Sequence, residues 1–145
     1  MVSPADLFQI AHQAGLLLDK GYHCSEAVFW AGRQVFPDEV LPSMQKITTP
    51  FAGGVGGTNA GLCGALTGGI ILIGALYGRM DGNQADHCCQ DFAERFYRSF
   101  SNEFGFTICK DLKEHWRGKP GQESCTVLVE KAVLCLFAVL NKEKN

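Results

Sequence analysis

The sequence predicts an all-α fold, a single-domain bundle of about five helices with a glycine-rich loop before a central buried helix. Apolar residues recur at helical spacing in several long stretches, and Ser, Gly and Pro residues stand where these stretches begin or end. No run of alternating apolar and polar residues indicates a strand. The 145 residues, 46% of them hydrophobic, suffice to bury one core, so we expect one domain over residues 1–145.

The first two helices have clear boundaries in the sequence. Ser3 is a suitable N-cap and Pro4 a suitable first helical residue, and apolar residues then follow at helical spacing until Gly21 ends the helix. A second helix is expected to begin near Cys24, and Pro37 ends it. Residues 37–50 contain three prolines and read as a connection with one short helical turn.

The middle of the chain predicts the loop and the central helix. Residues 51–61 are rich in glycine and are too flexible for a helix. Residues 62–76 follow as an uncharged helical stretch. Between Phe51 and Gly78 no residue is charged, which raises the alternative of a membrane span, but the apolar part is shorter than the roughly 20 residues that a span needs. We therefore expect a buried helix and no membrane insertion.

The second half predicts two further helices. Residues 84–104 form the clearest helical pattern, because phenylalanines repeat every four residues from Phe92 to Phe104 and the charges lie mainly elsewhere. Gly105 ends this helix, and a loop rich in Lys, Gly and Pro is expected over residues 113–121. The last helix is predicted to run from about residue 124 to 140.

Composition limits the classes of partner and the cellular compartment. With 13 Lys and Arg against 15 Asp and Glu, the net charge of -2 offers no basic surplus for nucleic acid. The first residues lack the basic and apolar regions of a secretory signal. We therefore expect a cytoplasmic location, where structural disulfides are rare, so the 7 Cys residues indicate metal binding, redox chemistry or buried thiols.

Two familiar motifs do not apply. Gly54-Val55-Gly56 lacks the preceding strand and the third glycine of a dinucleotide-binding loop. The four histidines form no metal-binding pair, and although His23 and His87 each precede a cysteine, we do not expect them to be ligands.

Cysteines coincide with predicted helix starts. Cys24, Cys63 and Cys125 each fall at the beginning of a helix, and Cys109 falls in the loop after the phenylalanine-rich helix. Helix N-termini carry free N–H groups and positive partial charge, which stabilise a thiolate, the form of cysteine that binds metals and attacks electrophiles. The remaining cysteines lie inside helices and read as small core or surface residues: Cys88, Cys89 and Cys135.

Glycines accompany these cysteines. Gly64 follows Cys63 and leaves room beside its sulfur, and the glycine-rich loop can present several N–H groups to an anion or to sulfide. The candidate cofactor-binding residues are therefore Gly54, Gly56, Gly57 and Gly64. The alternative is that these glycines only form turns and close helix contacts.

The order of these elements resembles the redox-active protein family named for its cysteine pattern C_GCAxxG_C_C. The elements are Cys24-Ser25-Glu26-Ala27-Val28, Phe51-Ala52-Gly53-Gly54-Val55-Gly56, Cys63-Gly64-Ala65-Leu66-Thr67-Gly68, Cys109-x-x-Leu112 and Cys125-x-x-x-Val129, within residues 5–140. The resemblance implies a helical fold in which the four pattern cysteines are the functional groups. The family is similar to the cluster-carrying part of split-Soret cytochromes c, which implies an iron–sulfur site here.

The chain departs from the family pattern in three respects. His23 stands where members often have Asn, three cysteines are extra, and the haem half of the cytochromes is absent. The redox partner protein therefore stays unassigned, and the extra thiols offer substitute ligands.

Four functions are open at this point. The first is an electron carrier that holds an iron–sulfur cluster of unknown type through Cys24, Cys63, Cys109 and Cys125, and the second is metal-free thiol–disulfide chemistry in which Cys63 attacks. A structural zinc site is less favoured, because zinc sites usually use closely spaced cysteine pairs. A small helical membrane or partner-binding module, in which the cysteines have no functional role, is the fourth. Separately, the uncharged glycine-rich helix offers a surface for packing against a second copy, so a homodimer is open. Whether the protein is an oxidoreductase or only a carrier stays undecided.

Overall fold

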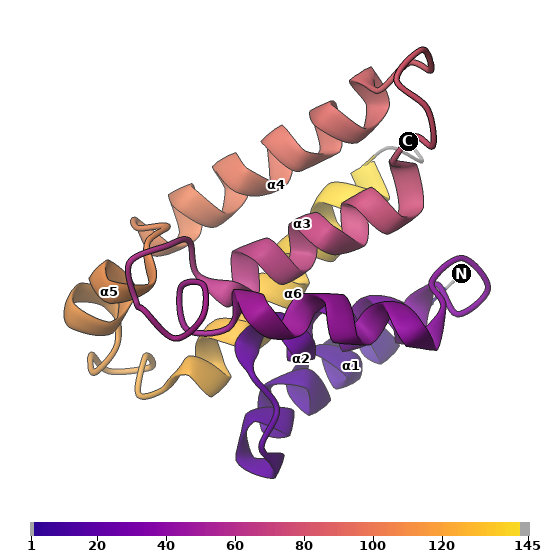
Figure 1. Cartoon of the computed structure of the whole chain (residues 1–145). Helices are drawn as coiled ribbons and strands as arrows, with labels where there is room; N and C mark the ends of the chain where they lie inside the picture. The colour runs from indigo at the N-terminus through magenta and orange to yellow at the C-terminus, as the bar shows by residue number, and fades with distance from the viewer. Residues whose placement is uncertain (1, 143–145) are drawn as a thin grey trace.

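The computed structural model describes residues 2–142 and is helical throughout (Figure 1). The longer helices are α1 (Pro4–Leu16), α2 (Cys24–Val35), α3 (Gly64–Tyr77), α4 (His87–Phe104) and α6 (Cys125–Lys142). The shorter helical segments are η1 (Leu17–Lys20), η2 (Pro42–Phe51), α5 (Cys109–Asp111) and η3 (Leu112–Trp116). The described residues contain no strand, only isolated bridges. The all-α prediction is confirmed, but about five helices is too few.

The first helix follows its sequence signals closely. The Ser3 hydroxyl accepts a hydrogen bond from the Asp6 N–H at 3.1 Å, and Pro4 is the first helical residue. Helical structure continues through η1 to Gly21, which has φ 92°, a left-handed conformation that favours glycine.

Two predicted connections are in fact helical. Residues 42–51 form the 3₁₀ helix η2, and the glycine-rich loop therefore begins at Ala52. The sequence shows no helical period here. η2 is instead held by tertiary hydrogen bonds, including one that the Ser25 hydroxyl donates to the Thr48 carbonyl at 2.8 Å. Likewise the predicted loop over 113–121 is helical as far as Trp116.

Two helix starts were placed too early. α4 begins at His87, because the Gln84 side chain accepts from the backbone N–H groups of Met80 and Asp81 in the preceding turn. α3 begins at Gly64, since Leu62 is engaged in an antiparallel bridge with Ile108.

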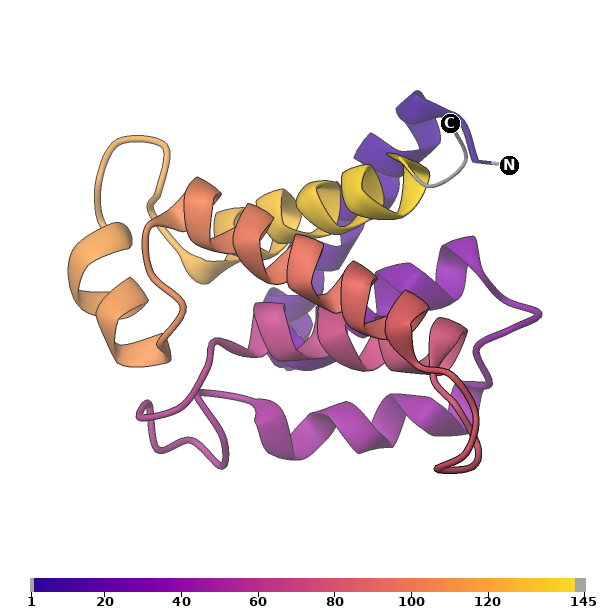
Figure 2. The same ribbon diagram turned by 90° about the horizontal axis from the view of Figure 1, so that it is seen from above.

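The core lies where α2, α3, α4 and α6 meet (Figure 2). The predicted phenylalanine face of α4 is confirmed, since all four of its phenylalanines are buried: Phe92, Phe96, Phe100 and Phe104. α3 is fully buried only in its first half, because Gly74 is exposed and the residues after it are only partly buried. The expectation of a wholly buried central helix is thus too strong.

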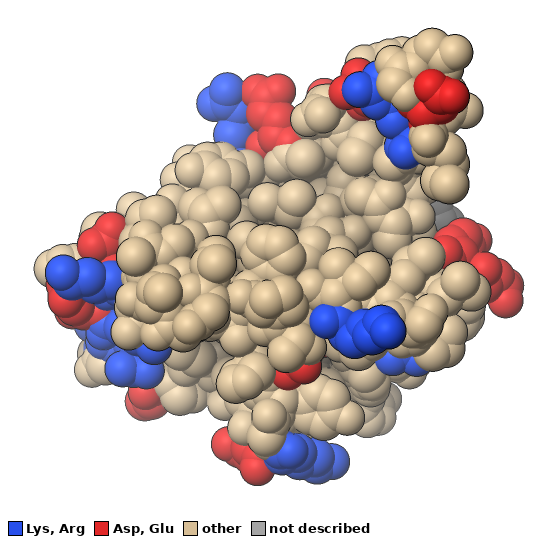
Figure 3. Space-filling view, in the orientation of Figure 1, with Lys and Arg blue, Asp and Glu red and all other residues tan. Residues whose placement is uncertain are grey.

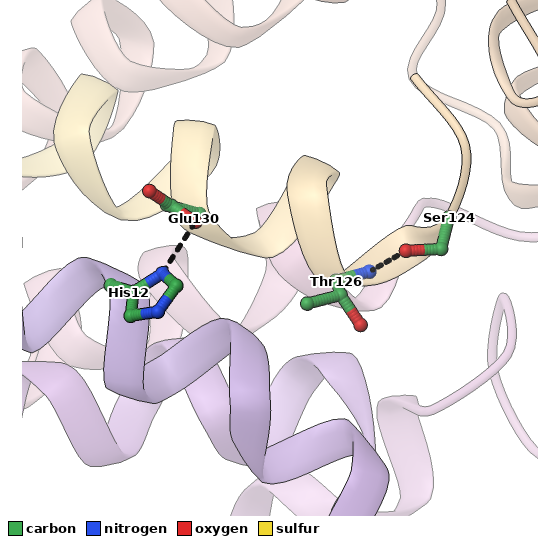
Figure 4. Close-up of polar contacts among 4 residues, drawn as sticks. All are labelled: His12, Ser124, Thr126 and Glu130. Atoms are coloured by element: carbon green, nitrogen blue, oxygen red, sulfur yellow. Dashed lines mark hydrogen bonds and ion pairs between the residues drawn. The ribbon is translucent and has the colours of Figure 1, made fainter. Parts of the chain in front are cut away.

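α1 packs lengthwise against α6 (Figure 4). Gly15 lies so close to α6 that a Cβ atom there would approach the Thr126 carbonyl to 2.7 Å. On the outer edge of this contact His12 Nδ1 lies 3.3 Å from the Glu130 carboxylate. The close approach of Gly15 to Thr126 holds α1 against the first turn of α6, which carries Cys125.

No described helix is both long enough and apolar enough to cross a lipid bilayer.

Three helices, α3, α5 and α6, begin at the same end of the molecule, on the left in Figure 1. The bridge between Leu62 and Ile108 directly precedes the starts of α3 and α5 in the sequence.

Candidate metal and redox centre

Four cysteines line one pocket at this end of the molecule. The pocket has a volume of about 260 Å³, and its walls contain Cys24, Cys63, Cys109 and Cys125. The remaining lining residues are Leu18, Tyr22, His23, Gly53, Leu112, Lys113, Arg117 and Leu128. All seven cysteines of the chain are free thiols.

Each of the four cysteines stands at the start of a helix. Cys24, Cys109 and Cys125 are the first residues of α2, α5 and α6, and Cys63 is the N-cap of α3. The sequence placed three of them correctly. Cys109 was expected in a loop, but it opens α5, a helix too short to have a recognisable period.

The Cys-Gly-Ala-x-x-Gly element brings α3 onto the first turn of α2. A Cβ atom at Gly64 would collide with the Cys24 sulfur, and one at Gly68 would collide with the Ser25 carbonyl. These two glycines are one helical turn apart and thus present a smooth face to α2. They allow the sulfurs of Cys24 and Cys63 to meet.

Cys24 and Cys63 form a hydrogen-bonded pair. The bond from the Cys63 thiol, helped by the backbone N–H of Gly53, lowers the pKa of Cys24 to about 6 from 9.0. The same bond, together with burial, raises the pKa of Cys63. The lowered pKa makes Cys24 the better candidate for the nucleophile of the pair, whereas Cys63 was expected from the sequence.

A short backbone pairing aligns Cys63 with Cys109. The Cys63 N–H donates to the Thr107 carbonyl at 2.8 Å, and the Cys109 N–H donates to the Gly61 carbonyl at 3.0 Å. These bonds flank the bridge between Leu62 and Ile108. Two cysteines separated by 46 positions are therefore held side by side by their backbones.

The glycine-rich loop folds over Cys109. Gly54 has φ 68°, and a Cβ atom there would lie 2.7 Å from the Cys109 Cβ. Gly56 and Gly57 are exposed, and their N–H groups donate within the loop, to the carbonyls of Pro50 and Ala52. None of the four glycines proposed to bind a cofactor lines the pocket, whose one lining glycine is Gly53. Gly54 and Gly64 nevertheless pack against Cys109 and Cys24.

Asn59 joins this loop to Cys109 and Lys113. Its side-chain Oδ1 accepts from the Lys113 ammonium at 2.8 Å and from the Cys109 thiol at 3.5 Å. Its backbone is left-handed, with φ 63°, a conformation that Asn tolerates better than most residues. Burial raises the pKa of Cys109, and the charge of Lys113 opposes that effect.

Cys125 lies on the opposite wall, at the start of α6. The Ser124 hydroxyl accepts from the Thr126 N–H at 3.2 Å and so caps this helix (Figure 4). The Arg117 guanidinium lies 4.0 Å from the Cys125 sulfur.

The remaining cysteines do not line the pocket. Cys88 and Cys89 lie in the first turn of α4, and Cys135 lies inside α6, where burial raises its pKa. They are therefore not placed as substitute ligands. Among the histidines His23 does line the pocket, at the N-cap of α2, while His87 does not.

The four sulfurs are not gathered around a single point. In the part of the chain that the structure describes, the one group of three Cys, His, Asp or Glu ligand atoms all within 4.8 Å of one another is Asp111, Glu114 and His115, on the surface. A tetrahedral zinc ion would need its four sulfurs about 3.8 Å apart, given Zn–S bonds of about 2.3 Å. The four sulfurs are therefore not spaced as the ligands of one zinc ion.

Sequence reasoning missed three residues of this site: Asn59, Lys113 and Arg117 contact pocket cysteines or each other in the folded structure. Gly53 was named only as part of the glycine-rich loop, and the structure places it in the pocket lining. The density of Lys and Arg between 110 and 119 was a usable signal for Lys113 and Arg117.

Comparison with known proteins places the chain in one family. No curated protein and no solved structure matches it. A family model described as "Putative redox-active protein (C_GCAxxG_C_C)" matches residues 22–138, which include all four pocket cysteines. The resemblance expected from the sequence is thereby confirmed, and the chain belongs to this redox-active cysteine-motif family.

Proposed function

We propose that this protein carries electrons one at a time through an iron–sulfur cluster held by Cys24, Cys63, Cys109 and Cys125. One observation carries the proposal: four cysteines from distant parts of the sequence line a single pocket. Four thiolates are the ligand set of common iron–sulfur clusters. A bound cluster would supply reversible one-electron chemistry.

The geometry favours a cluster over a single ion. The sulfurs are spread over a pocket of about 260 Å³, and no three of them lie within 4.8 Å of one another. A cluster spans the space between its ligands, whereas a zinc ion would require them to converge. Soft thiolate donors suit iron–sulfur chemistry as well as zinc, so the spacing decides the preference.

The chain would balance the charge of its ligands in two ways. Lys113 and Arg117 line the pocket and offset the negative charge of thiolates. The N–H groups of Gly53 and Ser25 already bond to the Cys24 sulfur, and such bonds to ligand sulfurs raise the reduction potential of a cluster.

Apolar walls would limit the access of water. Leu112 and Leu128 are 3% and 2% exposed, and both line the pocket together with Leu18. A dry wall strengthens the electrostatic effect of the nearby cations and N–H groups. The proposal includes a location in a reducing compartment such as the cytoplasm, because such a compartment keeps free thiols reduced, and all seven cysteines are free. It describes a carrier, for which no catalytic base is needed.

The test is anaerobic purification followed by analysis of iron, zinc and acid-labile sulfide in one sample. We expect iron and sulfide in similar amounts and a brown protein that bleaches on reduction. A colourless preparation without iron, or one with stoichiometric zinc, would overturn the proposal.

The Cys24–Cys63 pair also supports a second function, metal-free thiol–disulfide exchange. The Cys24 thiolate would attack a substrate disulfide, releasing one thiolate and forming a mixed disulfide. Cys63, once deprotonated, would then attack the Cys24 sulfur and release the second thiolate, leaving a Cys24–Cys63 disulfide. Intact mass measured on metal-free protein with oxidised glutathione should show the loss of two hydrogens, and a persistent reduced mass would exclude this function.

A further inference from the structure

Apart from the cysteines, the charged side chains that line the pocket are all cations. Two of the lining residues are cations, Lys113 and Arg117, and no Asp or Glu lines the pocket. This contrasts with the whole chain, whose net charge is -2. Arg117 and Tyr22 are exposed, so the charge and an aromatic ring both face solvent at the mouth of the pocket.

These two cations are not neutralised by carboxylates. The ion pairs of the described residues occupy other cations, such as Arg98 with Glu94 and Lys131 with Glu103. Lys113 instead bonds to an amide oxygen, and Arg117 points toward the Cys125 sulfur. No carboxylate of the described residues therefore competes with an incoming acidic group for these two cations.

Further cations flank the opening. Four of the 13 Lys and Arg residues fall within residues 110–119, against two acidic residues, Asp111 and Glu114. Lys110 and Lys119 are exposed there. Figure 3 shows Lys and Arg side chains, with some acidic ones among them, at the end of the molecule that carries α5 in Figure 1.

We infer that this mouth is the docking surface for an acidic electron-transfer protein. The inference rests on the proposed function, because a carrier must bring its own centre close to that of its partner. Opposite charges raise the rate of encounter between such proteins. Tyr and Arg are residue types enriched in protein interfaces, and both are exposed at this opening. One electron passes between the two centres, so one is oxidised and the other reduced, and no bond forms or breaks.

Binding can be tested without reference to the cluster. Fluorescently labelled poly-L-glutamate serves as a model of an acidic protein surface, and anisotropy reports its binding to the purified protein. We expect binding at low salt that weakens steeply as salt is added, because the contact is electrostatic. Arg117→Glu should weaken it about tenfold, whereas Arg117→Lys should keep most of it.

The matched control is Lys46→Glu on η2. Lys46 is exposed and does not line the pocket, and its reversal changes the net charge by the same amount. Equal weakening in both variants would show a response to net charge alone and overturn the inference, as would the absence of binding at low salt. Circular dichroism checks that each variant is folded.

A second readout uses iron-loaded protein and two small oxidants. The anion hexacyanoferrate(III) takes up one electron to become hexacyanoferrate(II), and the cation hexaammineruthenium(III) does the same to become the ruthenium(II) complex. We expect Arg117→Glu to lower the ratio of the first rate to the second, a ratio in which any change that the variant makes to the centre itself cancels. A protein that holds iron but shows no such discrimination refutes the docking surface alone. A protein without iron refutes the proposed function, and the poly-L-glutamate result then stands as a separate measurement of the docking surface.

Discussion

The sulfur of Cys24 lies directly against Gly64, the residue that follows Cys63. This contact explains why a glycine stands beside the second cysteine: the sulfurs of Cys24 and Cys63 can form their hydrogen bond only if no Cβ atom separates the helices that carry them. The motif therefore contributes close helix packing as well as one of the pocket cysteines.

Gly64→Ala should disrupt this contact. The added Cβ atom would collide with the Cys24 sulfur, and overpacking of this kind costs about 1–3 kcal/mol. Urea unfolding should show the loss, and the iron content of anaerobically prepared protein should fall. Gly74→Ala is the control on the same helix, because nothing lies within 4 Å of its added Cβ, and it should stabilise the protein slightly. A Gly64→Ala protein that keeps full iron content would contradict the packing role.

Cys24 should be the most reactive pocket thiol in metal-free protein. Its pKa of about 6 means that the thiolate dominates above that pH, so alkylation by iodoacetamide should accelerate between pH 5 and 7 with a midpoint near 6. Cys63→Ala removes the hydrogen bond that chiefly lowers this pKa and should move the midpoint toward the usual thiol value. Cys135, whose pKa burial raises, should react slowly at pH 7. Peptide mapping by mass spectrometry distinguishes these sites.

Serine substitutions should separate pocket cysteines from the others. Cys63 is buried in the pocket wall, and Cys63→Ser, which removes one of the four proposed ligands, should abolish cluster assembly. Cys135→Ser lies outside the pocket lining and should leave iron and sulfide content intact. Equal losses in the two variants would rule out the ligand assignment.

Asn59 should contribute to stability through its left-handed backbone and to iron retention through its side chain. Asn59→Gly keeps the left-handed backbone but loses the bonds to Cys109 and Lys113, so iron retention should fall while the fold persists. Asn59→Ala should lose the same bonds and also cost about 1–2 kcal/mol in stability for the unfavourable φ. Urea unfolding and iron analysis on both variants test this. Unchanged iron retention in the glycine variant would leave Asn59 only a backbone role.

Phe100 should be the strongest single contributor to the core of α4. It is fully buried, and its ring lies 4.5 Å from that of Phe104 and 6.2 Å from that of Phe96. Phe100→Ala should cost about 3–5 kcal/mol, measured by chemical denaturation. Tyr97→Ala on the same helix, with 39% of the residue exposed, should cost well under half as much.

Helix boundaries and buried faces were predictable from the sequence wherever they depend on neighbouring residues. The Ser3 cap, the four-residue phenylalanine repeat and the cysteines at the starts of α2, α3 and α6 are all short-range patterns, and the structure has them as predicted. Membership of the cysteine-motif family was recognisable for the same reason, because each element of its pattern is a short contiguous stretch and the elements occur in order.

Features set by tertiary contacts were not predictable. The bridge between Leu62 and Ile108 involves one residue from each segment and therefore leaves no alternating pattern. η2 is held by hydrogen bonds to α2, and its sequence alone resembles a proline-rich connection. The meeting of Asn59 with Lys113 depends on this bridge and on the loop, so no spacing rule could have found it.

The distribution of the four pocket cysteines over α2, α3, α5 and α6 constrains biosynthesis. The ribosome releases Cys24 and Cys63 long before Cys125, so a nascent polypeptide carries only part of the pocket for most of its translation. A cluster of the kind proposed would therefore be inserted only after the chain has been translated at least as far as the start of α6.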